Sequence, residues 1–129
     1  GKTKNVKNSI YDFLKFKNIG KKLNFFKNKK IDQKHKGFDT TYIVKKNSRN
    51  FVGSLKNNNS NVQVDFFSNL PGLQLYSAQN LSYKKKLFPY QGICLETQYF
   101  PDTPNKKNFP STLIKANKRY TCFTKIKIY

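Results

Sequence analysis

The chain has 129 residues, of which 36% are hydrophobic and 16% aromatic, and its formal net charge is +20. This length allows one domain at most, and twelve Phe with eight Tyr can build a core, which excludes a disordered tail. No apolar run approaches the roughly 20 residues that span a bilayer, so a membrane-spanning helix is excluded as well.

Helical periodicity is poor along the chain. Short β-branched and aromatic runs separated by Asn, Gly, Pro and Ser predict an all-β fold. Residues 1–36 are polar and rich in lysine, and they predict an ordered connection. Six strands follow, at residues 41–45, 51–55, 61–67, 73–77, 92–99 and 119–129. Their spacing of roughly ten residues is typical of an antiparallel sandwich or barrel.

The segments between the strands carry turn and loop residues. Turns are predicted at 56–60 and 68–72, a loop at 81–91, and an extended loop around Pro101, Pro104 and Pro110.

The last predicted strand alternates between two faces, as expected of an antiparallel strand with one side covered. One face collects mostly apolar side chains, namely Tyr120, Cys122, Thr124, Ile126 and Ile128. Cys94 and Cys122 both lie in strand-like surroundings without a CxxC pair, so they are predicted to be buried free thiols.

The net charge of +20 has two interpretations. It could mark a nucleic-acid binder, or it could reflect the lysine and asparagine codons of an AT-rich genome. Nearly all the cations are lysines, and only Arg49 and Arg119 are arginines. Because arginine is favoured for bidentate phosphate contacts, we favour compositional drift and predict no specific nucleic-acid partner. Weak attraction to polyanions is still expected.

Glu96 is the one glutamate of the chain, and it lies in the segment GICLETQYFPDTPN (residues 92–105). Apolar neighbours raise a carboxylate's pKa and cations lower it, so a carboxylate between both can serve as a general base. Alternation alone places it with Cys94 and Gln98 on a mixed face, which leaves a solvated surface carboxylate as an equal alternative. His35 is predicted to be a solvated loop histidine, and the sequence predicts no metal site.

Four segments occur in an order that resembles the C-terminal part of the galactose mutarotase (aldose 1-epimerase) family. They are SIYDFLKFKNIGKKL, GFDTTYIV, LPGLQLYSAQNL, and GICLETQYFPDTPN followed by NFPSTLIKANKRYTCFTKIKIY. The most specific match is Leu95-Glu96-Thr97-Gln98 with Pro101-Asp102. The resemblance implies that residues 1–129 are the C-terminal portion of a single domain, an antiparallel β-sandwich of the supersandwich type, whose N-terminal half is absent.

The same resemblance implies a cytoplasmic enzyme that interconverts the α and β anomers of free aldohexoses such as galactose and glucose. The expected mechanism is acid–base ring opening without a cofactor or a metal. The oligomeric state stays open. Isolated from the rest of such a sandwich, the chain is expected to expose strand edges and a half-covered core.

Three residues match functional positions of the family. Glu96 matches the general base that takes the proton of the anomeric hydroxyl. Asp39 matches an aspartate that accepts hydrogen bonds from sugar hydroxyls, and Gln74 matches a polar contact to the sugar. Without the resemblance, Asp39 would be interpreted as a turn or cap residue and Gln74 as an exposed strand position. The family's histidines, including the proton donor, lie upstream, and His35 matches neither, so the chain alone is expected to be inactive.

The chain also departs from the family pattern. Thr40 stands where the family often has histidine, the loop at 81–91 is short and rich in lysine, and residues 116–120 replace a turn that contains glycine. The alternatives are a non-catalytic carbohydrate-binding β-domain on the same scaffold, a phosphosugar 1-epimerase, and a polyanion-binding protein. The Leu-Glu-Thr-Gln segment favours the free sugar.

Overall fold

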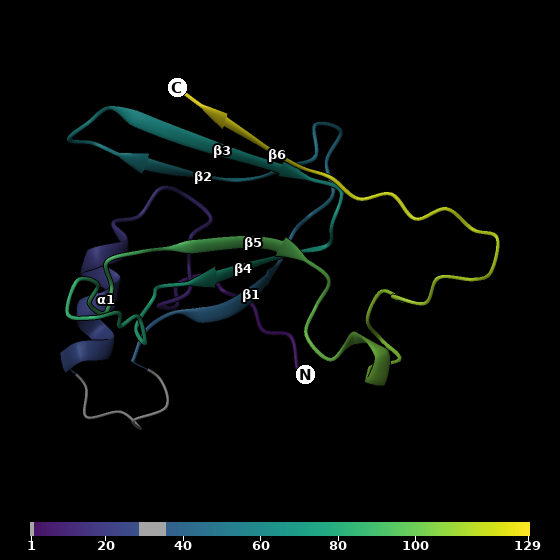
Figure 1. The fold of residues 1–129 in the computed structure, drawn as a ribbon, viewed down its shortest axis with the longest axis horizontal. Coiled ribbons are helices and arrows are strands. Elements are labelled where there is room, and N and C mark those ends of the chain that lie inside the picture. Colours follow the sequence, from purple (N-terminus) through teal and green to yellow (C-terminus); the bar gives the residue numbers. More distant parts are fainter. Residues whose placement is uncertain (1, 29–35) are drawn as a thin grey trace. The chain divides into compact units, whose positions relative to one another are not determined.

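The computed structural model describes residues 2–28 and 36–129, and Figure 1 labels helix α1 and strands β1 to β6. In chain order these are α1 (Ile19–Asn28), β1 (Asp39–Ile43), β2 (Phe51–Asn57), β3 (Val62–Ser68), β4 (Gly72–Tyr76), β5 (Cys94–Gln98), the short 3-10 helix η1 (Thr103–Asn105) and β6 (Thr124–Ile128). The strands form two three-stranded sheets, in the orders β1-β4-β5 and β2-β3-β6. The predicted all-β antiparallel class is confirmed. His35 lies outside the described residues.

The first five strands lie close to their predicted positions, whereas the sixth is confined to Thr124–Ile128. The prediction that one side of this strand is covered is wrong, because Ile126 and Ile128 are 54% and 72% exposed. Within the described residues β6 is an edge strand that pairs with β3. Alternation showed which side is apolar, but the presence of a covering layer depends on the rest of the fold.

Helix α1 contradicts the expectation from poor helical periodicity. The side chain of Asn18 caps its start, because its Oδ1 accepts a hydrogen bond from the backbone N–H of Lys21 at 2.9 Å. The buried side chains Leu23 and Phe26 are three residues apart, which places both on one face of the helix. An apolar stripe this narrow is hard to recognise among lysines and asparagines.

The chain forms two compact units. The first comprises Gly1–Thr40 and Leu75–Cys94, and its core is built around Phe38, which is 0% exposed. Three aromatic rings surround Phe38 edge to face, with centroid distances of 6.0, 5.3 and 5.0 Å to Tyr11, Phe13 and Phe26. The Phe38 backbone N–H also donates to the Ser77 hydroxyl at 2.8 Å. This ring cluster ties the N-terminal segment and α1 to the strands of the unit.

The second unit comprises Thr41–Gln74 and Leu95–Tyr129 and contains the whole β2-β3-β6 sheet. Its antiparallel register pairs Asp65 with Lys127 and Phe67 with Lys125. The hydroxyl groups of Thr97 on β5 and Thr124 on β6 are hydrogen-bonded, and the rings of Tyr99 and Tyr120 lie 6.5 Å apart between centroids. One side of β5 therefore faces β6 in this unit.

Both cysteines are free and exposed, so the prediction of buried thiols is wrong. Cys94 is the first residue of β5, and Cys122 lies in the segment before β6 that forms no strand. Neither cysteine is therefore in the interior of a sheet, where a facing layer could cover it.

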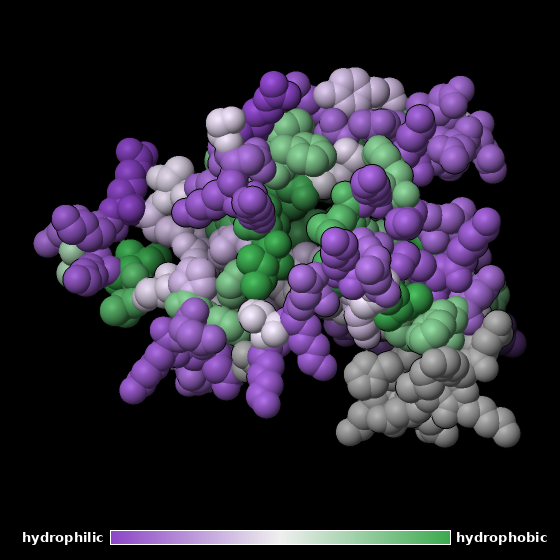
Figure 2. All heavy atoms as spheres, turned by 180° about the vertical axis from the view of Figure 1, so that it is seen from behind, coloured by the Kyte–Doolittle hydropathy of each residue, from purple (hydrophilic) through white to green (hydrophobic). Residues whose placement is uncertain are grey.

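Large hydrophobic side chains are exposed at several places, among them Leu113 at 77% and Ile114 at 57%. Figure 2 shows hydrophobic side chains exposed between hydrophilic ones on the face that it displays. Exposed apolar area of this kind favours association with other segments or chains.

Candidate active site

Glu96 lies in the middle of β5, and its side chain is exposed. Thr97 occupies the side of the strand that faces β6. Because side chains alternate along a strand, Glu96 points to the opposite side, away from β6. A ligand in solution can therefore reach this carboxylate.

Gln74 lies in β4 and is half-buried. Its Oε1 atom accepts a hydrogen bond from the hydroxyl of Thr41 on β1. This contact holds the amide of Gln74 in one orientation across the pair of strands. The interpretation of Gln74 as a merely exposed strand position is therefore wrong, and Thr41 is a further polar residue of this surface.

The approach of β4 to β5 depends on Gly72. A β-carbon added there would lie 3.0 Å from the carbonyl oxygen of Gln98 and 3.1 Å from the ring of Phe100. If β4 and β5 run antiparallel with Gly72 next to Gln98, alternation predicts that Gln74 and Glu96 are neighbours on these two adjacent strands. The second unit thus presents hydroxyl, amide and carboxylate groups on three neighbouring strands.

Asp39 is the first residue of β1, and its side chain is exposed. It occupies a strand, so the interpretation as a turn residue is wrong. Asp39 belongs to the first unit, whereas Gln74 and Glu96 belong to the second. That Asp39 and Glu96 contact the same sugar stays a prediction.

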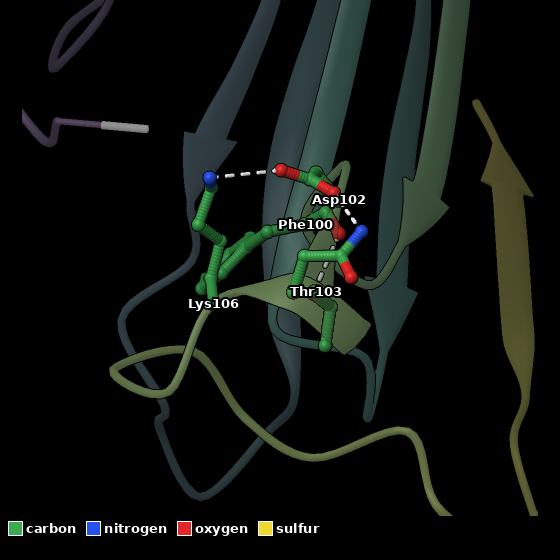
Figure 3. A network of polar contacts seen from close by, with 5 residues as sticks. Phe100, Asp102, Thr103 and Lys106 are labelled. Atoms are coloured by element: carbon green, nitrogen blue, oxygen red, sulfur yellow. Dashed lines mark hydrogen bonds and ion pairs between the residues drawn. The ribbon is translucent and has the colours of Figure 1, made fainter.

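Asp102 and Thr103 hold the segment that follows β5 through polar contacts, as Figure 3 shows. Asp102 Oδ1 accepts a hydrogen bond from the Asn105 side chain at 2.6 Å, and its Oδ2 forms an ion pair with Lys106 Nζ at 3.0 Å. The buried Thr103 donates its hydroxyl proton to the carbonyl of Phe100 at 2.6 Å. The sequence predicted only an extended loop here, whereas these contacts form η1 and hold the Phe100 segment next to Gly72.

The contacts of Asp102 predict a pH dependence. The hydrogen bond from Asn105 and the interaction with Lys106 hold the pKa of Asp102 below its ordinary value. A carboxylate with a lowered pKa in the folded chain stabilises it above the ordinary pKa, and this contribution is lost as the pH falls through the lowered value. We expect side-chain ¹³C NMR to give Asp102 a lower titration midpoint in the wild-type chain than in Asn105→Ala. Equal midpoints would show that the Asn105 contact does not form.

Residues 2–28 and 36–129 contain neither a metal-binding cluster nor a membrane-spanning helix. In this part of the chain no three His, Cys, Asp or Glu side chains lie together as metal ligands. The same residues contain no helix with the length and apolar character needed to cross a bilayer.

Two antiparallel sheets, with an exposed glutamate on β5 and an amide on β4 that accepts a hydrogen bond from a hydroxyl on β1, define an all-β sandwich protein. The sequence model of the aldose 1-epimerase family matches residues 1–127. The chain therefore belongs to this family, and the resemblance seen in the sequence is confirmed.

Several relatives are galactose mutarotases. The chain is 28% identical to that of Sus scrofa over 123 residues, which cover 89% of this chain and 34% of the relative. It is 29% identical to that of Mus musculus over 98 residues, covering 70% of this chain and 29% of the relative. It is 27% identical to the galactose mutarotase of Homo sapiens over 128 residues, which cover 93% of this chain and 35% of the relative. The chain thus spans about a third of the length of these relatives.

Proposed function

We propose that the protein containing this chain is an aldose 1-epimerase that interconverts the anomers of free aldohexoses such as galactose and glucose. Membership of the family over residues 1–127 supports the reaction class, and the name of the relatives supports galactose as a substrate. The observation that carries the proposal is the exposed position of Glu96 on β5, the strand next to the β4 strand that contains Gln74.

In the proposed reaction, the Glu96 carboxylate takes the proton from the O1 hydroxyl of the sugar. The electron pair of that O–H bond forms the C1=O1 carbonyl, and the C1–O5 bond breaks. We propose that O5 receives its proton from an acid that lies outside these residues. After rotation about C1–C2, O5 attacks the other face of C1 and returns its proton to the acid. Glu96 returns its proton to O1, which restores the carboxylate and gives the opposite anomer.

Two further residues are proposed to hold the sugar. Asp39 accepts hydrogen bonds from sugar hydroxyls, because an ionised carboxylate is a strong acceptor. Gln74 contacts a hydroxyl through an amide whose orientation Thr41 fixes. Fixed polar groups favour one orientation of the ring, which brings the O1 proton within reach of Glu96.

The test is anomer exchange measured by polarimetry and by NMR exchange between the two anomeric protons. We expect the protein encoded by the complete reading frame that includes these residues to accelerate equilibration of α-galactose well beyond buffer. The 129-residue chain alone is expected to match the buffer rate, because the acid is supplied elsewhere.

Two outcomes would count against the proposal. Fast exchange by the chain alone would place the acid within these residues. If the complete protein acts only on aldohexose phosphates and leaves free galactose and glucose unchanged, the free-sugar assignment is wrong.

A further inference from the structure

A second candidate site lies on the outer face of the β2-β3-β6 sheet, as a hollow of about 550 Å³. It is lined by Asn47, Arg49, Phe51, Asp65, Phe67, Lys127 and Tyr129. All these residues belong to the second unit. Ligand sites of small molecules commonly enclose about 300–1,000 Å³, so this hollow is large enough for one.

The hollow lies on a different surface from Glu96. Thr124 contacts β5, and alternation along β6 turns Lys125 and Lys127 to the opposite side. Glu96 likewise points away from the contact between β5 and β6. The two surfaces therefore face outward on opposite sides of this pair of strands, and a ligand in the hollow does not compete with a sugar at Glu96.

Cations outnumber acids around the hollow. Lys125 Nζ and Lys127 Nζ lie 5.4 and 5.7 Å from the centroid of the Phe67 ring, and Arg49 lines the hollow with Lys127. Asp65 is the one acidic side chain among the lining residues. The resulting excess of positive charge favours an anionic ligand.

Arg49 is placed by a structured turn. The Oδ1 atom of Asn47 accepts hydrogen bonds from the backbone N–H groups of Arg49 and Phe51, both at 3.1 Å. The Asn47 side-chain amide in turn donates to the Phe51 carbonyl at 2.8 Å. This turn fixes the backbone that carries Arg49, and a guanidinium can bind phosphate oxygens in a bidentate way.

The hollow also presents aromatic surface. Phe51 is 39% exposed and meets Phe67 edge to face at 5.7 Å, and Tyr129 is 63% exposed. The backbone of Tyr129 is held by a pair of hydrogen bonds with Gln63, at 2.9 and 3.2 Å. Exposed rings of this kind stack with flat nucleobases, and nearby basic side chains bind the phosphates.

Asp65 adds a fixed acceptor. Its Oδ1 accepts hydrogen bonds from the Ser54 hydroxyl at 2.6 Å and the Gln63 amide at 2.8 Å, and these bonds lower the pKa of Asp65. A carboxylate kept ionised can accept hydrogen bonds from ribose hydroxyls or from the amino group of a base.

We propose that this hollow binds a nucleoside phosphate, with the base against Phe51 and Tyr129 and the phosphate on Arg49 and Lys127. The three groups of such a ligand match the three kinds of side chain present: a flat ring for the aromatics, a phosphate for the cations, and hydroxyls for Asp65. This chemistry is found both in free nucleotides and in single-stranded nucleic acid. The proposal is independent of the sugar reaction at Glu96.

The test is a ¹H–¹⁵N NMR titration of the chain with AMP, ribose 5-phosphate and inorganic phosphate. We expect AMP to shift the amide signals of residues 49–51, 65–67 and 125–129, and to bind at least about tenfold more tightly than ribose 5-phosphate. Arg49→Gln should weaken AMP binding about tenfold, and Arg119→Gln, the same charge loss at the other arginine, should leave it unchanged.

Equal affinities for AMP and ribose 5-phosphate would overturn the proposal, because the rings would then contribute nothing. Equal weakening by Arg49→Gln and Arg119→Gln would overturn it too, since that result indicates only the general attraction of a chain with a charge of +20. A further titration with a thymidylate octamer distinguishes free nucleotides from single-stranded nucleic acid as the ligand. Tighter binding of the octamer that Arg49→Gln weakens and Arg119→Gln does not assigns the site to single strands, and binding no tighter than AMP assigns it to free nucleotides.

Discussion

Glu96→Gln in the complete protein is expected to lower kcat for galactose anomer exchange by about 10²–10⁴-fold. The amide has nearly the shape of the carboxylate but cannot take the O1 proton. The thermal unfolding midpoint should stay close to that of the wild type, because Glu96 is exposed. Polarimetry at saturating galactose measures the rate, and circular dichroism on the same samples measures the unfolding.

A matched control is Asp12→Asn, which removes one negative charge in the first unit. Asp12 accepts hydrogen bonds from the backbone N–H groups of Asn8 and Leu14, so removing its charge affects a local turn. We expect kcat of this variant to stay within about threefold of the wild type, equivalent to less than about 0.7 kcal/mol. An equally small effect of Glu96→Gln would refute the role of Glu96 as general base.

Phe38→Ala is expected to destabilise the chain by about 3–5 kcal/mol, the usual cost of removing a buried phenylalanine ring. Phe38 is 0% exposed, and the removed ring would leave a cavity among Tyr11, Phe13 and Phe26. A loss of this size is a large part of the stability of a small domain, so a substantial fraction of the variant should be unfolded without denaturant. Urea denaturation followed by far-UV circular dichroism measures it.

The matched control for Phe38→Ala is Leu14→Ala, since Leu14 belongs to the same unit and is 68% exposed. Surface substitutions of this kind usually change the free energy of unfolding by less than about 0.5 kcal/mol. If both variants unfold at the urea concentration of the wild type, Phe38 is not the centre of a packed core.

The strands could be predicted from the sequence because period-two alternation and turn residues are local signals. Helix α1 could not, because its buried stripe consists of Leu23 and Phe26 within a run of lysines and asparagines. The exposure of Cys122 and Ile128 could not be predicted from the sequence either. A pattern shows which side of a strand is apolar, whereas its burial depends on segments distant in the chain.

The candidate site could likewise be predicted only in part from the sequence. Glu96 stood out as the one glutamate within a specific motif, and Asp39 and Gln74 were suggested by the family resemblance alone. The contact between Thr41 and Gln74 could not be predicted, because it depends on the pairing of β1 with β4, two strands that are not consecutive in the chain. The hollow around Arg49 was missed because its lining residues come from three separate segments.

The order β2-β3-β6 has a consequence for how the chain folds. The hairpin of β2 and β3 is local and can form within about 1–10 μs, whereas β6 must close the long loop between Ser68 and Thr124. Non-local pairing of this kind slows folding. Until β6 arrives, the free edge of β3 can pair with the same edge of another molecule, so refolding yield should fall as protein concentration rises.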